Sequence, residues 1–159
     1  MSEAIHIYTD GAASGNPGPG GYGIVMLYKG HRKEISGGFK HTTNNRMELL
    51  AVIVALEQLK KDKCHVLVHS DSKYVVDAFE KKWLEGWIKK DFKKVKNVDL
   101  WKRLVLLCKE HHVKFKWVKG HAENVENNRC DELAVAAYKQ PGLKPDTGYE
   151  EAQENIFDQ

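Results

Sequence analysis

The sequence predicts a mixed α/β fold built on a single sheet. Three strand-like segments come first, and helical and strand-like segments then alternate along the rest of the chain. A chain of 159 residues, 42% of them hydrophobic, is large enough to bury one sizeable core. We therefore expect one domain whose five-stranded mixed sheet begins with antiparallel hairpins, gains later strands through helical crossovers and is covered by helices.

The first three strands are expected to pair as antiparallel neighbours. Residues 4–10 alternate between apolar and polar side chains, and a loop rich in Gly and Pro follows them. GYGIVMLY at residues 21–28 is typical of a second strand, and RKEISGGF at residues 32–39 of a third. Lys29-Gly30-His31 lies between these two runs as a tight turn. Strands joined by so short a turn are antiparallel.

Helices and strands alternate after residue 45. The predicted elements are a largely buried helix over 46–61, a buried strand over 65–71, a helical stretch over 72–90, an amphipathic helix over 98–112, a last strand over 114–120 and a final helix over 127–140. Gly86 is expected to interrupt the stretch over 72–90. We assign residues 1–142 to the domain and residues 143–159 to an acidic tail that is flexible in part.

Positive charge is concentrated in one place. The chain carries a net charge of +3, yet residues 81–96, KKWLEGWIKKDFKKVK, hold seven lysines against Glu85 and Asp91. We name residues 81–96 the basic segment. A run of this kind indicates a polyanionic partner more strongly than the mild overall charge does.

Cysteine usage and hydropathy favour a cytoplasmic protein. The three cysteines, Cys64, Cys108 and Cys130, are widely spaced and contain no C-x-x-C pair, so we expect no disulfide framework. The first residues do not resemble a signal peptide. No apolar run approaches the roughly 20 residues that cross a bilayer. We expect a monomer that does not contact membranes.

Four acidic residues stand where a ligand site is expected. Asp10 and Asp71 both end apolar, strand-like runs. If those strands are parallel neighbours, the two carboxylates meet at one edge of the sheet, where ligand sites in α/β folds gather. Glu48 and Asp131 lie in the first turns of two predicted helices that could reach the same edge.

Each acid also has a structural explanation. Asp10 and Asp71 suit turns or caps, Glu48 follows Asn45 in an N-x-x-E capping pattern, and Asp131 suits the positive end of a helix dipole. Four converging carboxylates would instead repel one another unless a cation held them. Sites made only of carboxylate oxygens suit Mg²⁺ or Mn²⁺.

Six motifs carry a resemblance to a known family. In chain order they are TDGAASGNPGPGGYG, TTNNRMELLA, DSKYV, KNVDLW, WVKGHA and NRCDELA. From about residue 4 to about residue 149 the sequence resembles type 1 ribonuclease H, of the bacterial ribonuclease HI kind with a basic protrusion. The resemblance implies that Asp10, Glu48, Asp71 and Asp131 surround two divalent ions, Mg²⁺ with Mn²⁺ as a substitute. It also implies hydrolysis of the RNA strand of an RNA–DNA hybrid, leaving a 5′-phosphate and a 3′-hydroxyl.

The resemblance assigns roles to further residues. His121 would shuttle protons or help the product leave, Asn127 would help position the site, and Thr43 would line a phosphate pocket. Asn16, Asn44 and Asn45 would contact the hybrid near the cut, and Lys73, where many relatives carry glutamine, would meet a phosphate. The structural alternatives are a surface loop histidine for His121, a helix cap for Asn127, and turn or N-cap roles for Asn16, Thr43, Asn44 and Asn45.

The basic segment would then grip the DNA strand of the hybrid. Lysines neutralise phosphates, and aromatic side chains can stack on sugars or bases. The candidate contacts are Trp83, Trp87, Lys89, Lys90, Lys93 and Lys94. In the alternative interpretation the aromatic residues pack the helix, Trp83 above all, and the lysines only solvate it.

Other functions fit the sequence less well. A DNA nuclease of the same fold would share the carboxylates but not NNRMEL, GHA and the basic segment together. A non-catalytic hybrid-binding module should lack at least one acid, and none is missing. GNPGPGG is not followed by the Lys-Ser/Thr of a phosphate-binding loop. Cys108, His111 and His112 lack a second ligand pair at zinc-site spacing.

Overall fold

The computed structural model describes residues 4–120 and 124–157 and contains the expected mixed sheet. Its strands are β1 (Ile5–Ala13), β2 (Gly18–Tyr28), β3 (His31–Thr42), β4 (His65–Ser70) and β5 (His112–Trp117). Their order across the sheet is β3-β2-β1-β4-β5. β1, β2 and β3 are antiparallel neighbours, whereas β4 is parallel to both β1 and β5. The predicted arrangement of strands is therefore confirmed.

The turn between β2 and β3 is as tight as the sequence predicts. Tyr28 and His31 are the last paired residues, so Lys29 and Gly30 alone form the turn. Both have positive φ, 49° and 81°, as a two-residue hairpin turn that follows the twist of the strands requires.

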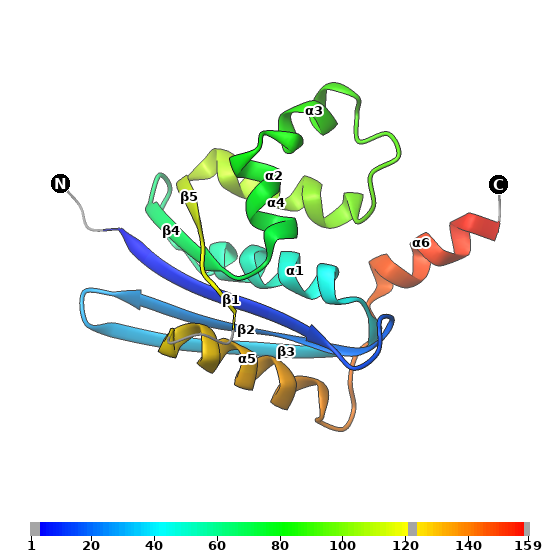
Figure 1. Ribbon diagram of the computed structural model, residues 1–159, viewed down its shortest axis with the longest axis horizontal. Coiled ribbons are helices and arrows are strands. Elements are labelled where there is room, and N and C mark those ends of the chain that lie inside the picture. The colour runs from blue at the N-terminus through cyan, green and yellow to red at the C-terminus, as the bar shows by residue number, and fades with distance from the viewer. Residues whose placement is uncertain (1–3, 121–123, 158–159) are drawn as a thin grey trace.

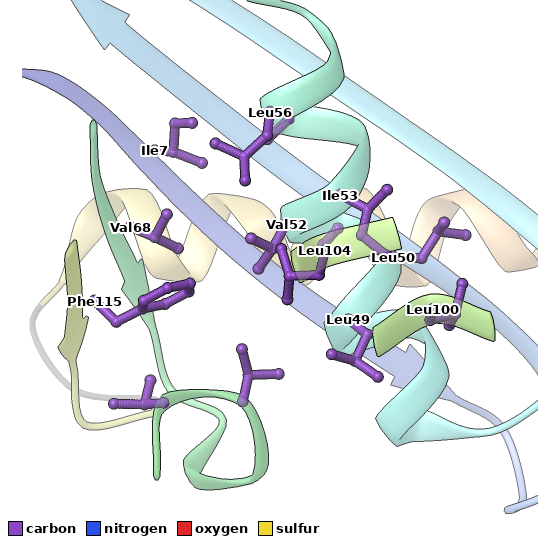
Figure 2. Close-up of a cluster of buried hydrophobic side chains, with 14 of the residues drawn as sticks. Ile7, Leu49, Leu50, Val52, Ile53, Leu56, Val68, Leu100, Leu104 and Phe115 are labelled. Atoms are coloured by element: carbon purple, nitrogen blue, oxygen red, sulfur yellow. The ribbon is translucent and has the colours of Figure 1, made fainter. Parts of the chain in front are cut away.

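Helices cover both faces of the sheet. They are α1 (Asn44–Glu57), α2 (Lys73–Glu80), α3 (Trp83–Lys89), α4 (Val98–Glu110), α5 (Val125–Tyr138) and α6 (Thr147–Phe157). α1 to α4 lie over one face, and α5 lies against the other, over β1, β2 and β3 (Figure 1). α1 is buried on almost every side because it lies between the sheet and α4. Figure 2 shows its leucine, valine and isoleucine side chains meeting those of the sheet and α4.

The break in the helical stretch over 72–90 lies at Lys82, so the prediction of a break at Gly86 is wrong. Lys82 has φ 59° and separates α2 from α3, while Gly86 lies inside α3. Nothing would lie within 4 Å of a Cβ atom at Gly86, so this glycine serves no close approach. Lysine rarely adopts a left-handed backbone, so the residue type gives no reason to expect a helix break at Lys82. Glycine does, and the sequence pattern therefore favoured Gly86 instead.

The segment after Pro141 is more ordered than the sequence suggests. Lys40 donates its backbone N–H to the carbonyl of Lys144 at 2.9 Å, and α6 follows over Thr147–Phe157. The last helix that the sequence predicts ends at residue 140, so the residue pattern missed α6. The contacts that hold it come from residues about 100 positions earlier, and no local pattern announces them.

Two further expectations concern cysteines and membranes. Cys64, Cys108 and Cys130 are all free thiols, as predicted. Within the described ranges, no helix combines the length and the apolar character needed to span a bilayer.

Candidate active site

The parallel pairing of β1 and β4 brings two of the predicted acids together. Thr9 and Ser70 are the last partners in this pairing, and Asp10 and Asp71 are the residues that follow them. The predicted neighbourhood of the two strands is thus confirmed. One detail differs, because β1 continues beyond Asp10 to Ala13 through its pairing with β2. Asp10 therefore lies within β1, at the point where its parallel partner ends.

Close packing of α1 on β1 brings a third acid to the same edge. A Cβ atom at Gly11 would overlap the backbone of Met47 and Glu48, so only glycine allows the helix to approach this near. Glu48 faces the strand from the first turns of α1 and is 4% exposed. Its N-x-x-E relation to Asn45 is not a cap, because the N-cap of α1 is Thr43.

Asp10, Glu48 and Asp71 form one compact group. Each offers a carboxylate oxygen, and these oxygens lie within 4.8 Å of one another. The backbone N–H of Gly11 donates to Asp10 Oδ1 at 2.9 Å. Glu48 Oε2 is buried and accepts no hydrogen bond in the described part of the chain. Three converging oxygens and one unpartnered buried acceptor fit a hard divalent cation such as Mg²⁺ or Mn²⁺.

The electrostatics of this group also favour a cation. Burial, together with the nearby charge of Asp71, raises the pKa of Asp10 to about 8. Burial and the charge of Asp10 raise the pKa of Glu48 well above its ordinary value. Removing carboxylates from water and placing them side by side disfavours their charged forms. A bound divalent cation would offset both effects and keep the acids ionised.

The fourth predicted acid, Asp131, lies near this group but not inside it. α5 approaches β2 closely because Gly23 has no side chain at the point of contact with the Cys130 carbonyl. Asp131 is half-buried, and its charge contributes to the raised pKa of Asp10. Its carboxylate does not belong to the group of oxygens within 4.8 Å.

Asn127 is buried one helical turn before Asp131. It is 2% exposed, and its Oδ1 has no hydrogen-bond partner in the portion of the chain that the structure describes. The cap of α5 is Asn124, whose side chain accepts from the backbone N–H of Asn127 at 2.9 Å. The alternative of Asn127 as the helix cap is therefore wrong, and its buried Oδ1 is available to another group.

His121 lies outside the described residues. Gly120, the residue before it, stands directly beside the site, since a Cβ atom there would be 2.8 Å from Asp71 Oδ2.

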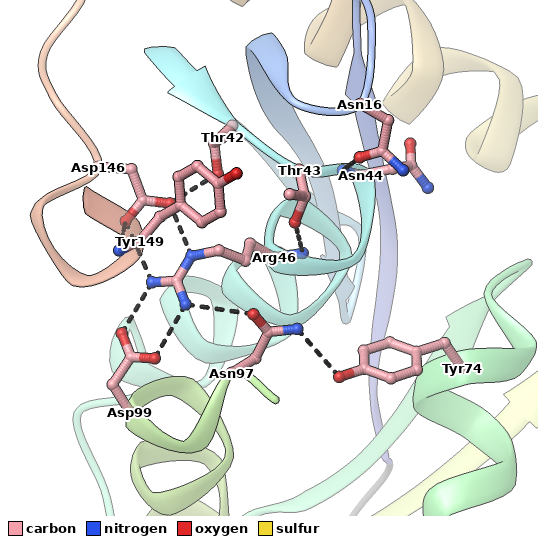
Figure 3. A network of polar contacts seen from close by, with 10 residues as sticks. All are labelled: Asn16, Thr42, Thr43, Asn44, Arg46, Tyr74, Asn97, Asp99, Asp146 and Tyr149. Atoms are coloured by element: carbon pink, nitrogen blue, oxygen red, sulfur yellow. Dashed lines mark hydrogen bonds and ion pairs between the residues drawn. The ribbon is translucent and has the colours of Figure 1, made fainter. Parts of the chain in front are cut away.

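The residues predicted to meet the hybrid near the cut gather at the start of α1. Asn44 donates its backbone N–H to Asn16 Oδ1 at 3.0 Å, and Thr43 Oγ1 accepts from the backbone of Arg46 at 3.2 Å (Figure 3). The N-cap role of Thr43 is thus confirmed. Asn16, Asn44 and Asn45 are all exposed at the surface.

A tryptophan to which the sequence assigned no role borders the cluster. Trp117 donates its indole N–H to the backbone carbonyl of Asp71 at 3.2 Å. The Lys73 ammonium lies 5.0 Å from the centre of the Trp117 ring, within cation–π range. Trp117 ends β5 and begins the WVKGHA motif, but its contact with the backbone of Asp71 is visible only in the three-dimensional structure.

The basic segment is exposed as its charge requires. Its lysines, Lys81, Lys82, Lys89, Lys90, Lys93, Lys94 and Lys96, are all exposed. Trp87 packs edge-on against the buried Trp101, with ring centres 5.1 Å apart, whereas Trp83 is 44% exposed. Expecting Trp83 to be the packing residue was therefore wrong, because Trp83 begins α3 on its solvent side.

No zinc site forms from Cys108, His111 and His112. The His111 ring accepts from the backbone N–H of Cys64, and the His112 ring stacks on His65. Over residues 4–120 and 124–157, the group of acids at the sheet edge is the one set of three or more potential ligands that converges.

Comparisons with known proteins agree with this geometry. A family model described as RNase H matches residues 2–139. The ribonuclease H of Desulforamulus reducens is 63% identical over 147 residues, covering 89% of this chain and 92% of that relative. The ribonuclease H of Trichodesmium erythraeum is 54% identical over 151 residues, covering 92% of this chain and 96% of that relative.

Solved structures show the same relationship. LC9-RNase H1, a type 1 RNase H with the type 2 active-site motif, has a TM-score of 0.77 and 31% identity, covering 95% of this chain and 81% of that chain. LC11-RNase H1, solved in complex with an RNA/DNA hybrid, has a TM-score of 0.64 and 30% identity, covering 85% of this chain and 96% of that chain. With its buried carboxylates gathered at one edge of the sheet, the chain belongs to the ribonuclease H family of nucleases.

Proposed function

We propose that this enzyme hydrolyses the RNA strand of RNA–DNA hybrids with two divalent ions held by Asp10, Glu48, Asp71 and Asp131. One observation carries the proposal. Three carboxylates converge within 4.8 Å and leave a buried Glu48 oxygen without a partner, in a chain of the ribonuclease H family. Mg²⁺ is the proposed ion, with Mn²⁺ as a substitute, because the converging ligands are all oxygens.

The chemistry divides between the ions and the side chains. When bound, two divalent ions supply activation of a water and stabilisation of the leaving oxygen, which gives a 5′-phosphate and a 3′-hydroxyl. The carboxylates hold the ions in place. His121 carries a proton or assists departure of the product, and the buried amide of Asn127 orients groups beside Asp131. All proposed ligands come from one chain, so a monomer suffices.

Recognition of the hybrid belongs to the residues around the cluster. Asn16, Asn44 and Asn45 carry amides suited to minor-groove edges, where 2′-hydroxyls distinguish RNA from DNA. We assign Thr43 and Lys73 to contacts with phosphates, and the basic segment to the supply of positive charge for the DNA strand. The related LC11-RNase H1 was solved with an RNA/DNA hybrid, which supports this choice of substrate.

The test compares matched substrates. The same sequence is offered as RNA–DNA hybrid, RNA duplex and DNA duplex, with Mg²⁺ and with a chelator. We expect Mg²⁺-dependent cleavage of the RNA in the hybrid alone, with ends that a ligase requiring a 5′-phosphate can join. Preferred cleavage of duplex DNA would favour a DNA nuclease of the same fold, and tight hybrid binding without cleavage would favour a non-catalytic module.

A further inference from the structure

A buried guanidinium joins three parts of the chain that are far apart in the sequence. Arg46 lies in the first turn of α1 and is 2% exposed. Its Nε and Nη2 donate to Asp146 at 2.8 and 3.1 Å, and its Nη1 and Nη2 donate to Asp99 at 2.9 and 2.7 Å. A fifth bond runs from Nη1 to Asn97 Oδ1 at 3.4 Å. Five N–H groups thus have five acceptors (Figure 3).

The carboxylate of Asp146 also holds the end of β3. Its Oδ2 accepts from the Thr42 hydroxyl at 2.6 Å, and its Oδ1 accepts from the backbone N–H of Tyr149 at 3.3 Å. Asp146 is 7% exposed and Thr42 is fully buried. Charge-assisted bonds shielded from water are stronger than bonds at the surface.

The positions of these partners give Asp146 its importance. Thr42 immediately precedes residues 43–45, and Arg46 immediately follows them. We name residues 43–45 the substrate turn, since the proposed function assigns all three to the hybrid. The buried carboxylate of Asp146, from the C-terminal segment, therefore bonds to the residues at both ends of the substrate turn (Figure 3).

The opposite side of the guanidinium contacts the residues that follow the basic segment. Asn97 directly follows residue 96 and is the N-cap of α4, and Asp99 lies in the first turn of that helix. Asn97 also donates to the hydroxyl of Tyr74 in α2 at 3.1 Å. The same Arg46 side chain therefore sets the position of the substrate turn relative to the end of the basic segment.

We propose that Asp146 is a positioning residue for substrate binding, acting through Thr42 and Arg46 to preform the substrate turn. A turn that is ordered before binding avoids the entropy cost of ordering it in the complex. Without the Asp146 charge, Arg46 would keep its ion pair with Asp99 but would lose the ion pair that connects it, through Thr42, to the end of β3. This inference rests on the proposed function, because it concerns how the hybrid is held rather than whether it is cut.

The test uses two variants of the full chain. Asp146→Asn keeps the shape of the side chain and removes its charge, and Thr42→Val removes only the hydroxyl that donates to Asp146. We expect the KM for hybrid to rise about tenfold in Asp146→Asn, as the loss of a charge-assisted hydrogen bond implies, with kcat within about twofold. Thr42→Val should raise KM less, since Arg46 keeps both carboxylates.

A second readout does not depend on cleavage. Hydrogen exchange at the backbone amides of Asn44 and Arg46 should accelerate about tenfold in Asp146→Asn without substrate, because both amides bond to side chains around the substrate turn. Amides of β4 should change only as far as global stability does. The exchange measurement keeps the two proposals distinguishable. A wild-type protein that cleaved nothing would overturn the proposed function, whereas the exchange rates would still test whether Asp146 orders the substrate turn.

The matched control is a core variant that is destabilised through packing alone. Ile53→Val removes one methylene from the fully buried side of α1 and touches none of these polar contacts. It should leave KM and the two exchange rates as in wild type at a temperature where all variants are folded. Unchanged KM in a folded Asp146→Asn protein, with or without faster exchange, would reduce Asp146 to a purely structural residue and overturn the inference. If Asp146→Asn does not fold, unchanged KM and exchange in Thr42→Val overturn it in the same way.

Discussion

Burial sets the chemistry of the acids at the sheet edge. Asp10 and Glu48 are 5% and 4% exposed, and the charge of Asp71 acts on both. An exposed aspartate would stay ionised near neutral pH without help. Here burial raises the pKa of both groups, so ionising the cluster requires a counter-charge. The converging carboxylates of Asp10, Glu48 and Asp71 are therefore better explained as ligands for a divalent cation than as residues that stabilise the fold.

At the residue scale, Glu48→Gln should impair cleavage in Mg²⁺ more than it impairs the fold. Removal of a group that only orients a metal ligand typically lowers metal affinity or activity by about 10–100-fold. Removal of a ligand charge should therefore lower kcat/KM by about 100-fold or more. High Mn²⁺ should restore part of the activity, because Mg²⁺ demands the more exact geometry. The measurement is kcat/KM in each metal.

The control for this variant lies on the same helix. Glu57→Gln changes an exposed glutamate at the end of α1 that pairs with Arg103. It should leave the metal dependence as in wild type. Full activity of folded Glu48→Gln in Mg²⁺ would remove Glu48 from the ligand set.

His121→Ala should slow turnover without abolishing it, because the carboxylates and their ions remain. Transfer of a proton by a placed side chain typically contributes ~10²–10⁴-fold, and a role in product release would contribute less. His31→Ala, at the exposed first residue of β3, is the control and should leave turnover as in wild type. Steady-state turnover across a pH series measures the effect. An unaltered rate and pH profile in His121→Ala would remove His121 from the catalytic residues.

At the element scale, different residues of the basic segment serve packing and binding. Trp87 packs on the buried Trp101, while the seven lysines are exposed to solvent. Trp87→Ala should therefore lower the free energy of unfolding by about 3 kcal/mol or more, as truncation of a packed aromatic does. The lysines should instead affect only the interaction with the hybrid.

A fourfold variant tests the second half of this division. Replacing Lys89, Lys90, Lys93 and Lys94 with alanine should raise KM much more than it lowers kcat. Each lysine that pairs with a phosphate contributes about one unit of slope to the salt dependence of affinity in the B-DNA limit, so the variant should show a flatter dependence. The measurement is KM across a salt series, with the melting temperature recorded for each protein.

The control variant makes the same change in net charge elsewhere. Alanine at Lys60, Lys61, Lys109 and Lys139, all exposed and outside the basic segment, should leave the salt slope nearly as in wild type. Equal slopes for the two fourfold variants would show that net charge alone acts and would remove the basic segment from the binding surface.

At the scale of the whole molecule, the buried acids make metal-free stability depend on pH. The pKa of Asp10 is about 8 in the fold against an ordinary value of 3.8, so between these values the folded chain binds more protons than the unfolded chain. Stability without metal is therefore greatest at the acid end of this range and falls as pH rises toward 8. For each pH unit between the two pKa values, the free energy of unfolding falls by about 1.4 kcal/mol for this one group.

Asp10→Asn should flatten this pH dependence. The variant loses a group that resists ionisation, so its metal-free melting temperature at pH 8 should equal or exceed that of wild type. Asp62→Asn, an exposed aspartate outside the cluster, should follow the wild-type curve. The measurement is the melting temperature of all three proteins between about pH 5 and about pH 8 in a chelating buffer. A parallel decline in wild type and Asp10→Asn would contradict the coupling between the cluster and stability.

Much of this architecture could be predicted because its signals are local. Alternation and turn chemistry revealed β1 to β3, and helical periodicity with apolar runs revealed the later elements. Asp10 and Asp71 could be paired because both acids directly follow apolar runs whose strands lie side by side in the same direction. The looser placement of Asp131, by contrast, depends on how closely α5 packs against Gly23, which the residue pattern does not encode.

The features that the sequence did not reveal depend on long-range contacts or on backbone conformation. Arg46 and Asp146 are 100 positions apart and meet only in the fold. The helix break at Lys82 depends on a left-handed lysine, and the exposure of Trp83 against the burial of Trp87 depends on which face of α3 meets Trp101. Residue type alone distinguishes neither case.

The most direct measurement is a Mg²⁺ titration of hybrid cleavage by wild type and Asp10→Asn side by side. Circular dichroism and a hybrid-binding assay establish that both proteins are folded and bind substrate. We expect wild type to cleave the RNA strand with a saturable Mg²⁺ dependence, and the folded, hybrid-binding Asp10→Asn protein to remain inactive at every Mg²⁺ concentration. Turnover by Asp10→Asn close to that of wild type would contradict the assignment of the buried carboxylates as the catalytic metal site.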